Sequence, residues 1–363
     1  MNILFAIKAL DGIKGGAERV LVDISSGMAA NGHKISVLSF DKKGGQSFYP
    51  LSADIPRICL EIGDINNRSG FGDTLSRLKA IRKTVKQEKP DVIIAFMHSM
   101  FIPVSIACIG LGIPIVASEH IVPAHYKNRR FEFALFMMSS FLIKKITVLS
   151  NTIKQTYPKF MQAKMIAIAN PVGIPSTHTR AKEESSKVIL NVGRLDPQKD
   201  QKTLITAFSM IANDNPDWSL RIIGDGELKE ELANLISKYN LSDRILLAGT
   251  TSEINEEYKR ADIFALSSRY ESFGLATAEA MSHQLPVIGF ADCPGTNELI
   301  IHQENGLLID VKEREKSMAD ALQSLIDDQS LRAELGKNGL ITAKKYELPV
   351  ILAQWEEMLE KLI

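Results

Sequence analysis

The chain has 363 residues, of which 45% are hydrophobic and 24% are charged, and its formal net charge at pH 7 is zero. This length is enough for two domains of ordinary size, and the composition excludes a largely disordered chain. No apolar stretch reaches the roughly 18 residues of a membrane span, and the apolar run Met1–Ile7 is too short for a signal peptide. The three scattered cysteines predict neither a disulfide framework nor a zinc site, so we expect a cytoplasmic protein.

The zero net charge conceals a difference between the two halves of the chain. Residues 1–170 contain 22 Lys and Arg against 12 Asp and Glu, whereas the remainder contains 21 against 31. A basic half joined to an acidic half favours a protein that is oriented against an anionic surface, with uneven solvation charge as the alternative. A nucleic-acid-binding protein would show a less compensated excess, so we expect no nucleic-acid partner.

Strand-like apolar runs alternate with helix-like stretches along the whole chain, which is the pattern of doubly wound α/β folds with parallel sheets. In the first half the predicted strands are Asn2–Ile7, Lys34–Phe40, Asp91–Phe96, Ile113–Ser118, Ile146–Ser150 and Met165–Ala169. In the second half they are Val188–Val192, Leu220–Ile223, Ile245–Ala248, Ile263–Ser267, Pro286–Phe290 and Gly306–Ile309. The polar segment Ser176–Ser186 predicts a linker, so we expect domains at 1–175 and 176–345, followed by a final helical segment at 346–363.

A glycine-rich turn, Asp11–Arg19, follows the first predicted strand and opens onto a helix that starts near Ala17. Gly15 and Gly16 would let backbone N–H groups approach an anion at that helix end. The turn does not match G-x-G-x-x-G, although Asp41 lies near the position of the ribose-binding acid in a dinucleotide fold. A turn needed only for tight packing is the alternative.

Glu119 and His120 follow the predicted strand Ile113–Ser118, and we expect both to contact the acceptor. A histidine there could exchange a proton near neutral pH or donate a hydrogen bond to a substrate hydroxyl. His98, at the end of another predicted strand, is a weaker candidate of the same kind. For both histidines a purely structural role is the alternative.

Three basic residues crowd the predicted start of a helix within His125–Lys145, where the helix dipole disfavours cations. This basic segment consists of Lys127, Arg129 and Arg130. An acceptor diphosphate or lipid headgroups would offset its charge, and three nearby aromatic residues could enter a membrane interface: Phe131, Phe133 and Phe136. Alternatively, the apolar part of this stretch packs on the first sheet.

Gly193, Arg194 and Lys199 lie in the loop after Val188–Val192. A guanidinium and an ammonium in one loop can converge on a diphosphate, because a loop can fold positions five apart together. Two ordinary surface cations are the alternative. Asp200 is the predicted start of the next helix.

Two further glycine loops follow strands in this half, Gly224-Asp225-Gly226 and the turn at Gly249. Asp225 and Glu227 have the D-x-D-like spacing of a metal motif, but Arg194 and Lys199 already supply cations for phosphate. We therefore predict no metal.

Glu271 and Glu279 lie eight residues apart within Arg269–Met281, with the start of an Ala-rich helix between them. Phe273, Gly274 and Leu275 would present N–H groups at the helix N-terminus, where a diphosphate fits, and the carboxylates could accept hydrogen bonds from hydroxyls. A nucleotide sugar offers both groups. A helix with two solvated glutamates is the alternative.

The residue types in these motifs are more specific than their spacing. E-S-F-G-L-x-x-x-E at 271–279, G-R-L-D-x-x-K at 193–199, G-G-A-E-R at 15–19 and S-E-H at 118–120 resemble the motifs of retaining glycosyltransferases of family four. The wording is most similar to that of bacterial N-acetylgalactosamine or hexose transferases that extend undecaprenyl-diphosphate-linked glycans. This resemblance implies the GT-B fold: two Rossmann-like doubly wound domains facing across a cleft, with a C-terminal helix that crosses back to the first domain and buries Trp355 there.

The resemblance also implies a role for each site residue. Glu271 would contact the donor sugar and Glu279 the ribose, while the turn at Gly249 would meet the nucleotide base. Arg194 and Lys199 would hold the departing diphosphate, which Gly15 and Gly16 would also face. His120 would lie near the sugar or the acceptor.

We therefore expect a retaining, metal-independent enzyme without a cofactor that moves a hexose or N-acetylhexosamine from a UDP-sugar to a hydroxyl of a polyprenyl-diphosphate-linked bacterial surface glycan, as in polysaccharide or lipopolysaccharide biosynthesis. The acceptor would attack from the face that the leaving group occupies, and the leaving phosphate would take its proton. Peripheral contact with the cytoplasmic face of the anionic inner membrane would accompany this activity. An NAD-dependent oxidoreductase and a catalytically silent nucleotide-sugar-binding subunit are the alternatives. The sequence identifies neither the sugar nor the choice between UDP and GDP.

Overall fold

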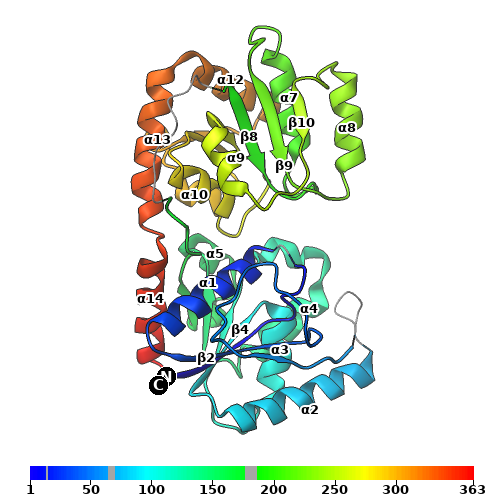
Figure 1. Ribbon diagram of the computed structural model, residues 1–363, viewed down its shortest axis with the longest axis vertical. Helices are drawn as coiled ribbons and strands as arrows, with labels where there is room; N and C mark the ends of the chain where they lie inside the picture. Colours follow the sequence, from blue (N-terminus) through cyan, green and yellow to red (C-terminus); the bar gives the residue numbers. More distant parts are fainter. Residues whose placement is uncertain (14, 64–69, 176–185) are drawn as a thin grey trace. The chain divides into compact units, whose positions relative to one another are not determined.

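The computed structural model describes residues 1–13, 15–63, 70–175 and 186–363 (Figure 1). The chain divides into two compact units: unit 1 comprises Met1–Pro171 and Leu348–Ile363, and unit 2 comprises Val172–Glu347. Residues 176–185 of the predicted linker and Lys14 of the predicted glycine loop lie outside the described residues.

The described part of unit 1 contains one sheet of seven parallel strands in the order β3-β2-β1-β4-β5-β6-β7. Its strands are β1 (Asn2–Ala6), β2 (Lys34–Ser39), β3 (Arg57–Cys59), β4 (Val92–Phe96), β5 (Ile115–Ser118), β6 (Lys145–Val148) and β7 (Met165–Ala167). Its helices are α1 (Gly16–Ala30), α2 (Phe71–Glu88), α3 (His98–Ala107), the 3₁₀ helix η1 (Pro123–Asn128), α4 (Arg130–Ser139), α5 (Asn151–Thr156), α6 (Lys159–Gln162) and α14 (Leu348–Glu360). All five residues of β4 are buried, because helices cover both faces of a parallel sheet and its strands are continuous apolar runs.

Helix α14 follows unit 2 in the sequence but packs on α1 in unit 1 (Figure 1). The two helices approach closely at Gly27, where a Cβ atom would lie 2.5 Å from the Leu352 side chain. Asn31 Nδ2 donates to Glu356 Oε1 over 2.8 Å, and Trp355 is buried. The final helix is therefore part of the core of unit 1.

The described part of unit 2 contains a six-stranded parallel sheet in the order β10-β9-β8-β11-β12-β13. Its strands are β8 (Val188–Val192), β9 (Ser219–Ile223), β10 (Ile245–Leu247), β11 (Ile263–Ala265), β12 (Val287–Phe290) and β13 (Leu307–Ile309). Its helices are α7 (Gln201–Ile211), α8 (Lys229–Lys238), α9 (Ile254–Arg260), α10 (Leu275–Ser282), α11 (Thr296–Leu299), α12 (Arg314–Asp327) and α13 (Gln329–Lys344).

A large apolar cluster forms the core of unit 2, where α7 and α12 pack against each other and against the sheet. Leu204, Phe208, Leu322 and Leu325 are fully buried in it. Each such side chain contributes about 1.5–3 kcal/mol relative to an exposed one. The loops at the ends of β8, β11 and β12 are therefore carried on a rigid base.

Both sheets reverse their strand order at one place, between β1 and β4 in unit 1 and between β8 and β11 in unit 2. In open α/β sheets ligands bind outside the carboxyl ends of the strands at this switch point. The predicted architecture of two Rossmann-like, doubly wound domains is confirmed. In unit 2 the switch point lies between the two strands whose loops carry Lys199 and Glu271.

Candidate active site

Lys199 and Glu271 meet at the switch point of unit 2. Lys199 Nζ lies 2.6 Å from Glu271 Oε1, with 16% and 10% of the two side chains exposed. Ser268 Oγ donates to the same carboxylate oxygen over 2.6 Å. The loops themselves are joined, because Ser267 Oγ donates to the Lys199 carbonyl over 2.8 Å. A cation and a carboxylate are thus held together, with little exposure, where this fold binds ligands.

The loop that follows β12 supports the Glu271 loop from behind. Glu271 N donates to the Pro294 carbonyl over 3.1 Å. Gly295 has φ = 79°, and a Cβ atom there would lie 2.8 Å from the Glu271 carbonyl oxygen and 2.9 Å from Phe273 N, so only glycine fits. Burial raises the pKa of the neighbouring Cys293 thiol to about 12, which keeps it a neutral core group. Pro294 and Gly295 were not predicted, although a Pro-Gly pair after a strand is a recognisable turn signal.

Helix α10 begins directly after this loop. Gly274 is its N-cap with φ = 84°, and the helix runs from Leu275 to Ser282 with Glu279 in its second turn. Glu279 is largely buried, and Tyr258 Oη donates to its Oε2 over 2.9 Å. The N–H groups of the first turn and the two carboxylates therefore lie on one continuous loop and helix, as predicted. Tyr258, which orients Glu279, was not predicted.

Phe273 contributes to this loop through its backbone. Its ring is buried and meets the Tyr346 ring edge-on, with 5.1 Å between the centroids. The side chain therefore anchors the start of α10 on the body of unit 2.

The predicted glycines lie at the ends of three neighbouring strands, β8, β9 and β10. Gly224 N donates to the Gly249 carbonyl over 2.8 Å, and a Cβ atom at Gly224 would lie 1.9 Å from the Gly193 carbonyl oxygen. A Cβ atom at Gly226 would lie 2.4 Å from the Leu195 carbonyl oxygen. Close backbone packing thus accounts for Gly224 and Gly226, while Asp225 between them is exposed to solvent.

The structure does not bring Arg194 to Lys199. The Arg194 side chain is 73% exposed and pairs with Asp196 at 3.1 Å, whereas Lys199 turns towards Glu271. Asp200 occupies the N-cap position of α7 as predicted, but it has φ = 48° and makes no cap hydrogen bond to the helix backbone. Its carboxylate instead pairs with Arg269 at 2.7 Å.

In unit 1, His120 lies in a largely apolar environment at the end of β5. Its ring stacks on Phe96 with 5.1 Å between the centroids, and its Nε2 is 3.0 Å from Ser118 Oγ. Burial lowers the pKa of His120 to about 4. The imidazole is therefore held neutral near pH 7, and in this form it can hydrogen-bond to a hydroxyl.

Glu119 does not face a ligand. It is almost fully buried, with its Oε1 accepting from Ile121 N over 3.0 Å and its Oε2 accepting from Tyr126 Oη over 2.8 Å. Burial raises its pKa to about 8. The predicted acceptor role of this residue is replaced by a structural one, the fastening of η1 to the end of β5.

The surroundings of the basic segment differ in part from the prediction. Lys127 lies in η1, and only Arg129 and Arg130 flank the start of α4. Glu132 in the first turn of α4 lies 3.6 Å from Arg129 and 3.5 Å from His98, so the protein supplies an anion of its own. Burial lowers the pKa of His98.

The three aromatic residues predicted for a membrane interface fall in different environments. Phe131 is 75% exposed, but Phe136 is fully buried, so the prediction for Phe136 is wrong. Phe133 is intermediate and stacks obliquely on Tyr126 with 5.2 Å between the centroids. The face of α4 that carries Phe136 therefore packs in the core of unit 1.

The predicted glycine loop of unit 1 is filled by its own chain. Gly15 is the N-cap of α1, and the Glu18 carboxylate folds back so closely that a Cβ atom at Gly15 would lie 2.0 Å from its Oε2. Gly16 is the first residue of the helix. Burial raises the pKa of Glu18. The anion beside this helix end is thus a carboxylate of the protein itself.

Asp41 is not available to a dinucleotide ribose. Its side chain is fully buried, its Oδ2 accepts from Leu10 N over 2.8 Å, and it pairs with Arg57 at 3.2 Å. Arg57 also pairs with Asp11 at 2.7 Å and so fastens the start of the glycine loop. This use of Asp41 counts against the oxidoreductase alternative.

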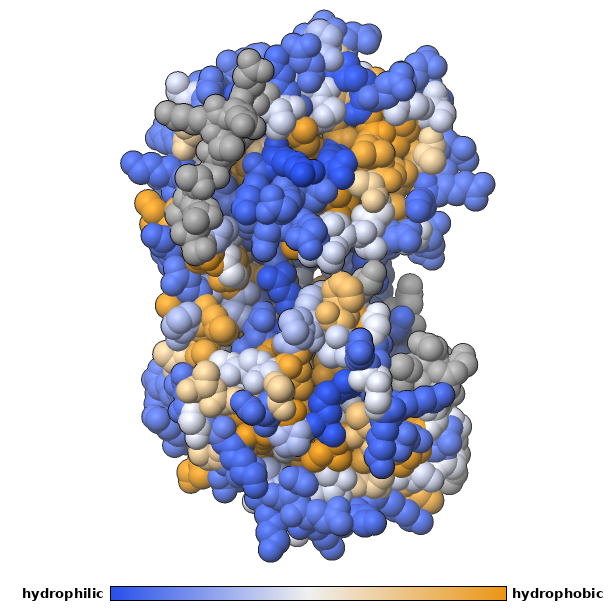
Figure 2. Space-filling model, in the orientation of Figure 1, coloured by the Kyte–Doolittle hydropathy of each residue, from blue (hydrophilic) through white to orange (hydrophobic). Residues whose placement is uncertain are grey.

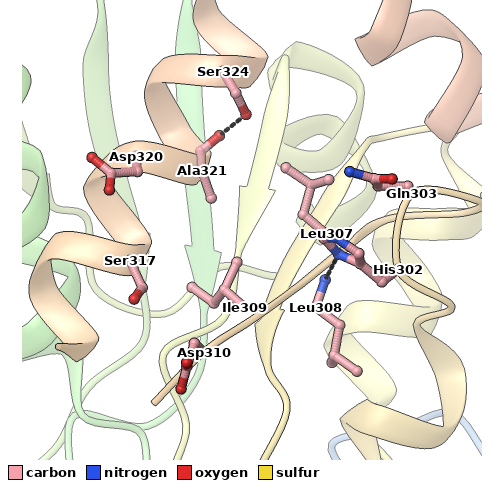
Figure 3. A pocket seen from close by; sticks show the side chains of 10 residues that line it. All are labelled: His302, Gln303, Leu307, Leu308, Ile309, Asp310, Ser317, Asp320, Ala321 and Ser324. Carbon is pink, nitrogen blue, oxygen red and sulfur yellow. Dashed lines mark hydrogen bonds between the residues drawn. The ribbon is translucent and has the colours of Figure 1, made fainter. Parts of the chain in front are cut away.

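A pocket of about 380 Å³ lies elsewhere in unit 2, beside the edge strand β13 and helix α12 (Figure 3). It is lined by His302, Gln303, Leu307, Leu308, Ile309, Asp310, Ser317, Asp320, Ala321 and Ser324. None of the predicted site residues is among them. The pocket therefore adds nothing to the site at the switch point.

Hydrophobic side chains gather in separate patches on the visible face of each unit (Figure 2).

Across the described residues, no helix is both long and apolar enough to cross a membrane. Within the same residues there is no group of three or more His, Cys, Asp and Glu side chains that could hold a metal ion.

Comparisons with known proteins identify two matching families and several similar proteins. Residues 14–173 match the family described as Glycosyltransferase Family 4, and residues 177–341 match the family described as Glycosyl transferases group 1. An uncharacterized glycosyltransferase of Methanocaldococcus jannaschii is 30% identical over 252 residues, which are 66% of this chain and 68% of the relative.

A second relative is similar over its full length. It is a Campylobacter jejuni α-1,4-N-acetyl-D-galactosaminyltransferase named for a diphosphate-undecaprenol-linked glycan, and it is 27% identical over 367 residues, or 100% of this chain and 99% of the relative. Among solved structures, Anabaena HepE in complex with UDP and glucose superimposes with a TM-score of 0.79 at 22% identity, covering 99% of this chain and all of that one.

The fold and the site thus define a glycosyltransferase of the GT-B class. Within that class, the chain belongs to glycosyltransferase family four.

Proposed function

We propose that this glycosyltransferase moves a hexose or N-acetylhexosamine from a UDP-sugar to a hydroxyl of a polyprenyl-diphosphate-linked bacterial glycan, with retention of configuration and without a metal. The observation that carries the proposal is the pairing of Lys199 with Glu271 beside the N-terminus of α10. A diphosphate is bound by cations and N–H groups, and sugar hydroxyls donate to carboxylates. Unit 2 holds all three kinds of group at its switch point.

Donor binding would exchange the partners of this pair. A donor phosphate would replace the Glu271 carboxylate at Lys199 Nζ, and a sugar hydroxyl would join Ser268 Oγ as a donor to Glu271. Glu279, oriented by Tyr258, would accept from the ribose hydroxyls. The relative HepE, which was solved with UDP and glucose, supports a nucleotide of this kind.

In the reaction, the bond between the anomeric carbon and the phosphate oxygen breaks while the acceptor oxygen attacks from the same face. The acceptor proton passes to the departing phosphate. Negative charge grows on that phosphate, so Lys199 would stabilise the transition state more than the bound donor. Arg194 would join it by exchanging its partner Asp196 for the phosphate. His120 is neutral and would hydrogen-bond to a substrate hydroxyl.

We assign the acceptor to unit 1. The relative in Campylobacter jejuni is named for a glycan linked to diphosphate-undecaprenol, which supports a lipid-linked acceptor. The basic segment and the exposed Phe131 would contact the anionic, interfacial part of such an acceptor and of the membrane that carries it. Peripheral contact with the cytoplasmic face of the inner membrane is part of the same proposal.

The deciding experiment is a panel of radiolabelled UDP- and GDP-sugars with a polyprenyl-diphosphate-linked acceptor, in the presence and absence of EDTA. Transfer from a UDP-sugar that EDTA leaves unchanged, with an α-linked product from an α-linked donor by NMR, is the expected result. Transfer from GDP-sugars alone, an inverted product, or an EDTA loss that Mg²⁺ restores would each contradict one part of the proposal. Tight UDP binding without turnover of any donor would favour the silent subunit.

A further inference from the structure

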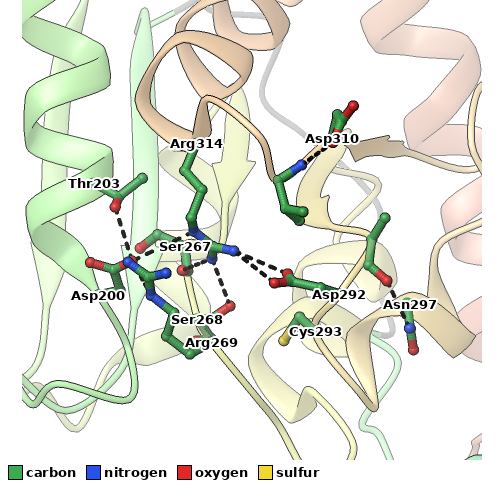
Figure 4. Close-up of polar contacts among 12 residues, drawn as sticks. Asp200, Thr203, Ser267, Ser268, Arg269, Asp292, Cys293, Asn297, Asp310 and Arg314 are labelled. Carbon is green, nitrogen blue, oxygen red and sulfur yellow. Dashed lines mark hydrogen bonds and ion pairs between the residues drawn. The ribbon is translucent and has the colours of Figure 1, made fainter.

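We propose that Arg314, the first residue of α12, is a positioning residue for the Lys199–Glu271 pair. The inference rests on the proposed function, because it assumes that this pair acts on the donor. Arg314 is 8% exposed and lies among three loops that follow different strands (Figure 4). Its guanidinium contacts all three of them.

The first contact is with the loop that carries Glu271. Arg314 Nη2 donates to the carbonyls of Ser267 and Ser268 over 3.1 and 3.4 Å. Ser268 Oγ in turn donates to Glu271 Oε1, and Ser267 Oγ donates to the Lys199 carbonyl. The two carbonyls that Arg314 holds therefore belong to the residues whose hydroxyls fix the ion pair.

The second contact is with the loop that carries Lys199. Arg314 Nε lies 3.8 Å from Asp200 Oδ2, next along the chain from Lys199. The same carboxylate pairs with Arg269 at 2.7 Å, two residues before Glu271. Asp200 is thus held between two arginines, which fixes the end of the Lys199 loop.

The third contact is with the loop that supports Glu271 from behind. Arg314 Nη1 donates to both oxygens of Asp292 over 3.0 and 3.1 Å, and its guanidinium lies 3.6 Å from the Phe290 ring centroid. Asp292 precedes Pro294, whose carbonyl accepts from Glu271 N. A planar fork with five N–H donors can make these bonds together, whereas a lysine cannot.

A positioning role for Arg314 can be distinguished from a general contribution to stability, because its hydrogen bonds are made to the loops of the site and not to the apolar core. Loss of the guanidinium would release three loops at the switch point, and a displacement of about 1 Å in a reacting group can cost about 10²-fold in rate. The apolar core beneath, made by α7 and α12, stays in place. We therefore expect Arg314 variants to lose turnover out of proportion to their loss of stability.

Unit 2 offers a matched control in Arg332. It is also 8% exposed, it donates to the carbonyls of Leu325 and Ile326 at the end of α12, and it lies 5.4 Å from the Trp218 ring centroid. Arg332 thus resembles Arg314 in burial, in donating to two backbone carbonyls and in lying near an aromatic ring. None of these contacts involves the loops that carry Lys199 or Glu271.

The test compares Arg314→Lys and Arg314→Met with Arg332→Met in the full-length protein, by Tm, by UDP affinity and by steady-state kinetics. For Arg314→Lys we expect a kcat reduction of about 10²-fold with KM for the donor within about 3-fold, at a Tm no lower than that of Arg332→Met. Equal losses of kcat in the Arg314 and Arg332 variants at equal Tm would overturn the inference, as would a normal kcat in Arg314→Lys.

Hydrogen–deuterium exchange provides a readout that does not depend on turnover. In Arg314→Lys, exchange should rise about 10-fold or more in peptides covering 194–200 and 267–275, and Arg332→Met should leave both peptides unchanged. Unchanged exchange in Arg314→Lys overturns the positioning role. If no protein turns over any UDP-sugar but the two loops still loosen in this selective way, the positioning role stands and the proposed function fails.

Discussion

Substitutions of Lys199 and Glu271 should have strongly non-additive effects on the free energy of unfolding, whereas turnover should stay low even when both are replaced. Lys199→Met removes the cation and keeps a side chain of similar length, which leaves the Glu271 carboxylate with only Ser268 as a close partner among its described contacts. Glu271→Gln removes the charge and keeps an oxygen that can accept from Ser268. The double variant contains neither charge, so it isolates the energy of the pair.

The two side chains are only 16% and 10% exposed, so the pair behaves as a nearly buried one. Breaking such a pair from one side costs about 3–5 kcal/mol, whereas replacing both partners is close to neutral. For a unit of this size, 1 kcal/mol shifts Tm by about 2–4 °C, so Lys199→Met should lower the Tm of unit 2 by roughly 6–20 °C. The double variant should recover most of that loss, which corresponds to a coupling energy of at least about 2 kcal/mol.

The two tryptophans of the chain make the measurement specific to one unit. Trp218 lies in unit 2 and Trp355 in unit 1, and both are buried. In a Trp355→Phe background, fluorescence of Trp218 reports the unfolding of unit 2 alone. Activity should not follow stability: kcat should fall by about 10²-fold or more in Lys199→Met and remain low in the double variant. Additive stability losses, or recovery of turnover in the double variant, would refute the assignment of this pair.

Three further predictions concern separate parts of the molecule. Glu279→Gln should weaken UDP binding about 10-fold, whereas Glu271→Gln should leave the UDP affinity within about 3-fold and reduce turnover. Equal loss of UDP affinity in the two variants, measured by calorimetric titration, would mean that the sugar and ribose assignments are misplaced. Burial raises the pKa of the Glu119 carboxyl group from 4.5 to about 8. Below pH 4.5 this group has no effect on stability. Between pH 4.5 and 8 the unfolded chain has released the proton that the folded chain keeps, so the free energy of unfolding falls by about 1.4 kcal/mol for each pH unit. Glu119→Gln should therefore gain Tm relative to the wild type at pH 8 but not at pH 4.5, and parallel pH curves would contradict the assignment. Replacement of the three residues of the basic segment by alanine should remove about 1 kcal/mol of attraction per charge to vesicles with anionic lipid, and less at high salt. UDP affinity should be unchanged. Equal co-sedimentation of the wild type and this variant with the vesicles would leave these residues as solvated charges.

The strands were predictable because parallel strands are buried on both faces and so appear as apolar runs. Val188–Val192 was predicted with its observed bounds, and the other predicted strands differ by one or two residues at their ends. The missed strand, β3, has three residues, begins with Arg57 and lies at the edge of its sheet, so it lacks the apolar run. Burial on both faces is the property that the sequence pattern encodes.

The relative position of site residues was predictable from spacing only where they lie on one stretch of chain. Glu271 and Glu279 are related by a single loop and helix, so their spacing carries structural information. Tyr258, Gly295 and Arg314 act on those residues from other elements, and no spacing in the sequence relates them. The roles of Gly295 and Arg314 depend on strand order, which brings the ends of β8, β11 and β12 together, whereas Tyr258 contacts Glu279 from helix α9.

Two errors could have been avoided from periodicity alone. Phe131 and Phe136 are five positions apart on α4, which places them about 140° apart around the helix, so one membrane could not take both. Ser118 and His120 are two positions apart at the end of β5 and lie on the same side, whereas Glu119 between them points to the other. The direction of each side chain was therefore implied by its position.

The packing of α14 on α1 has a consequence for how the protein is made. The ribosome synthesises all of unit 2 before it reaches α14, so unit 1 cannot cover the face of α1 around Gly27 until then. Unit 2 is a continuous piece of chain and can close its own core during translation. Unit 1, although it begins first, finishes last. A premature stop codon just before Leu348 would therefore leave unit 2 whole and disable unit 1, which contains the N-terminal strand.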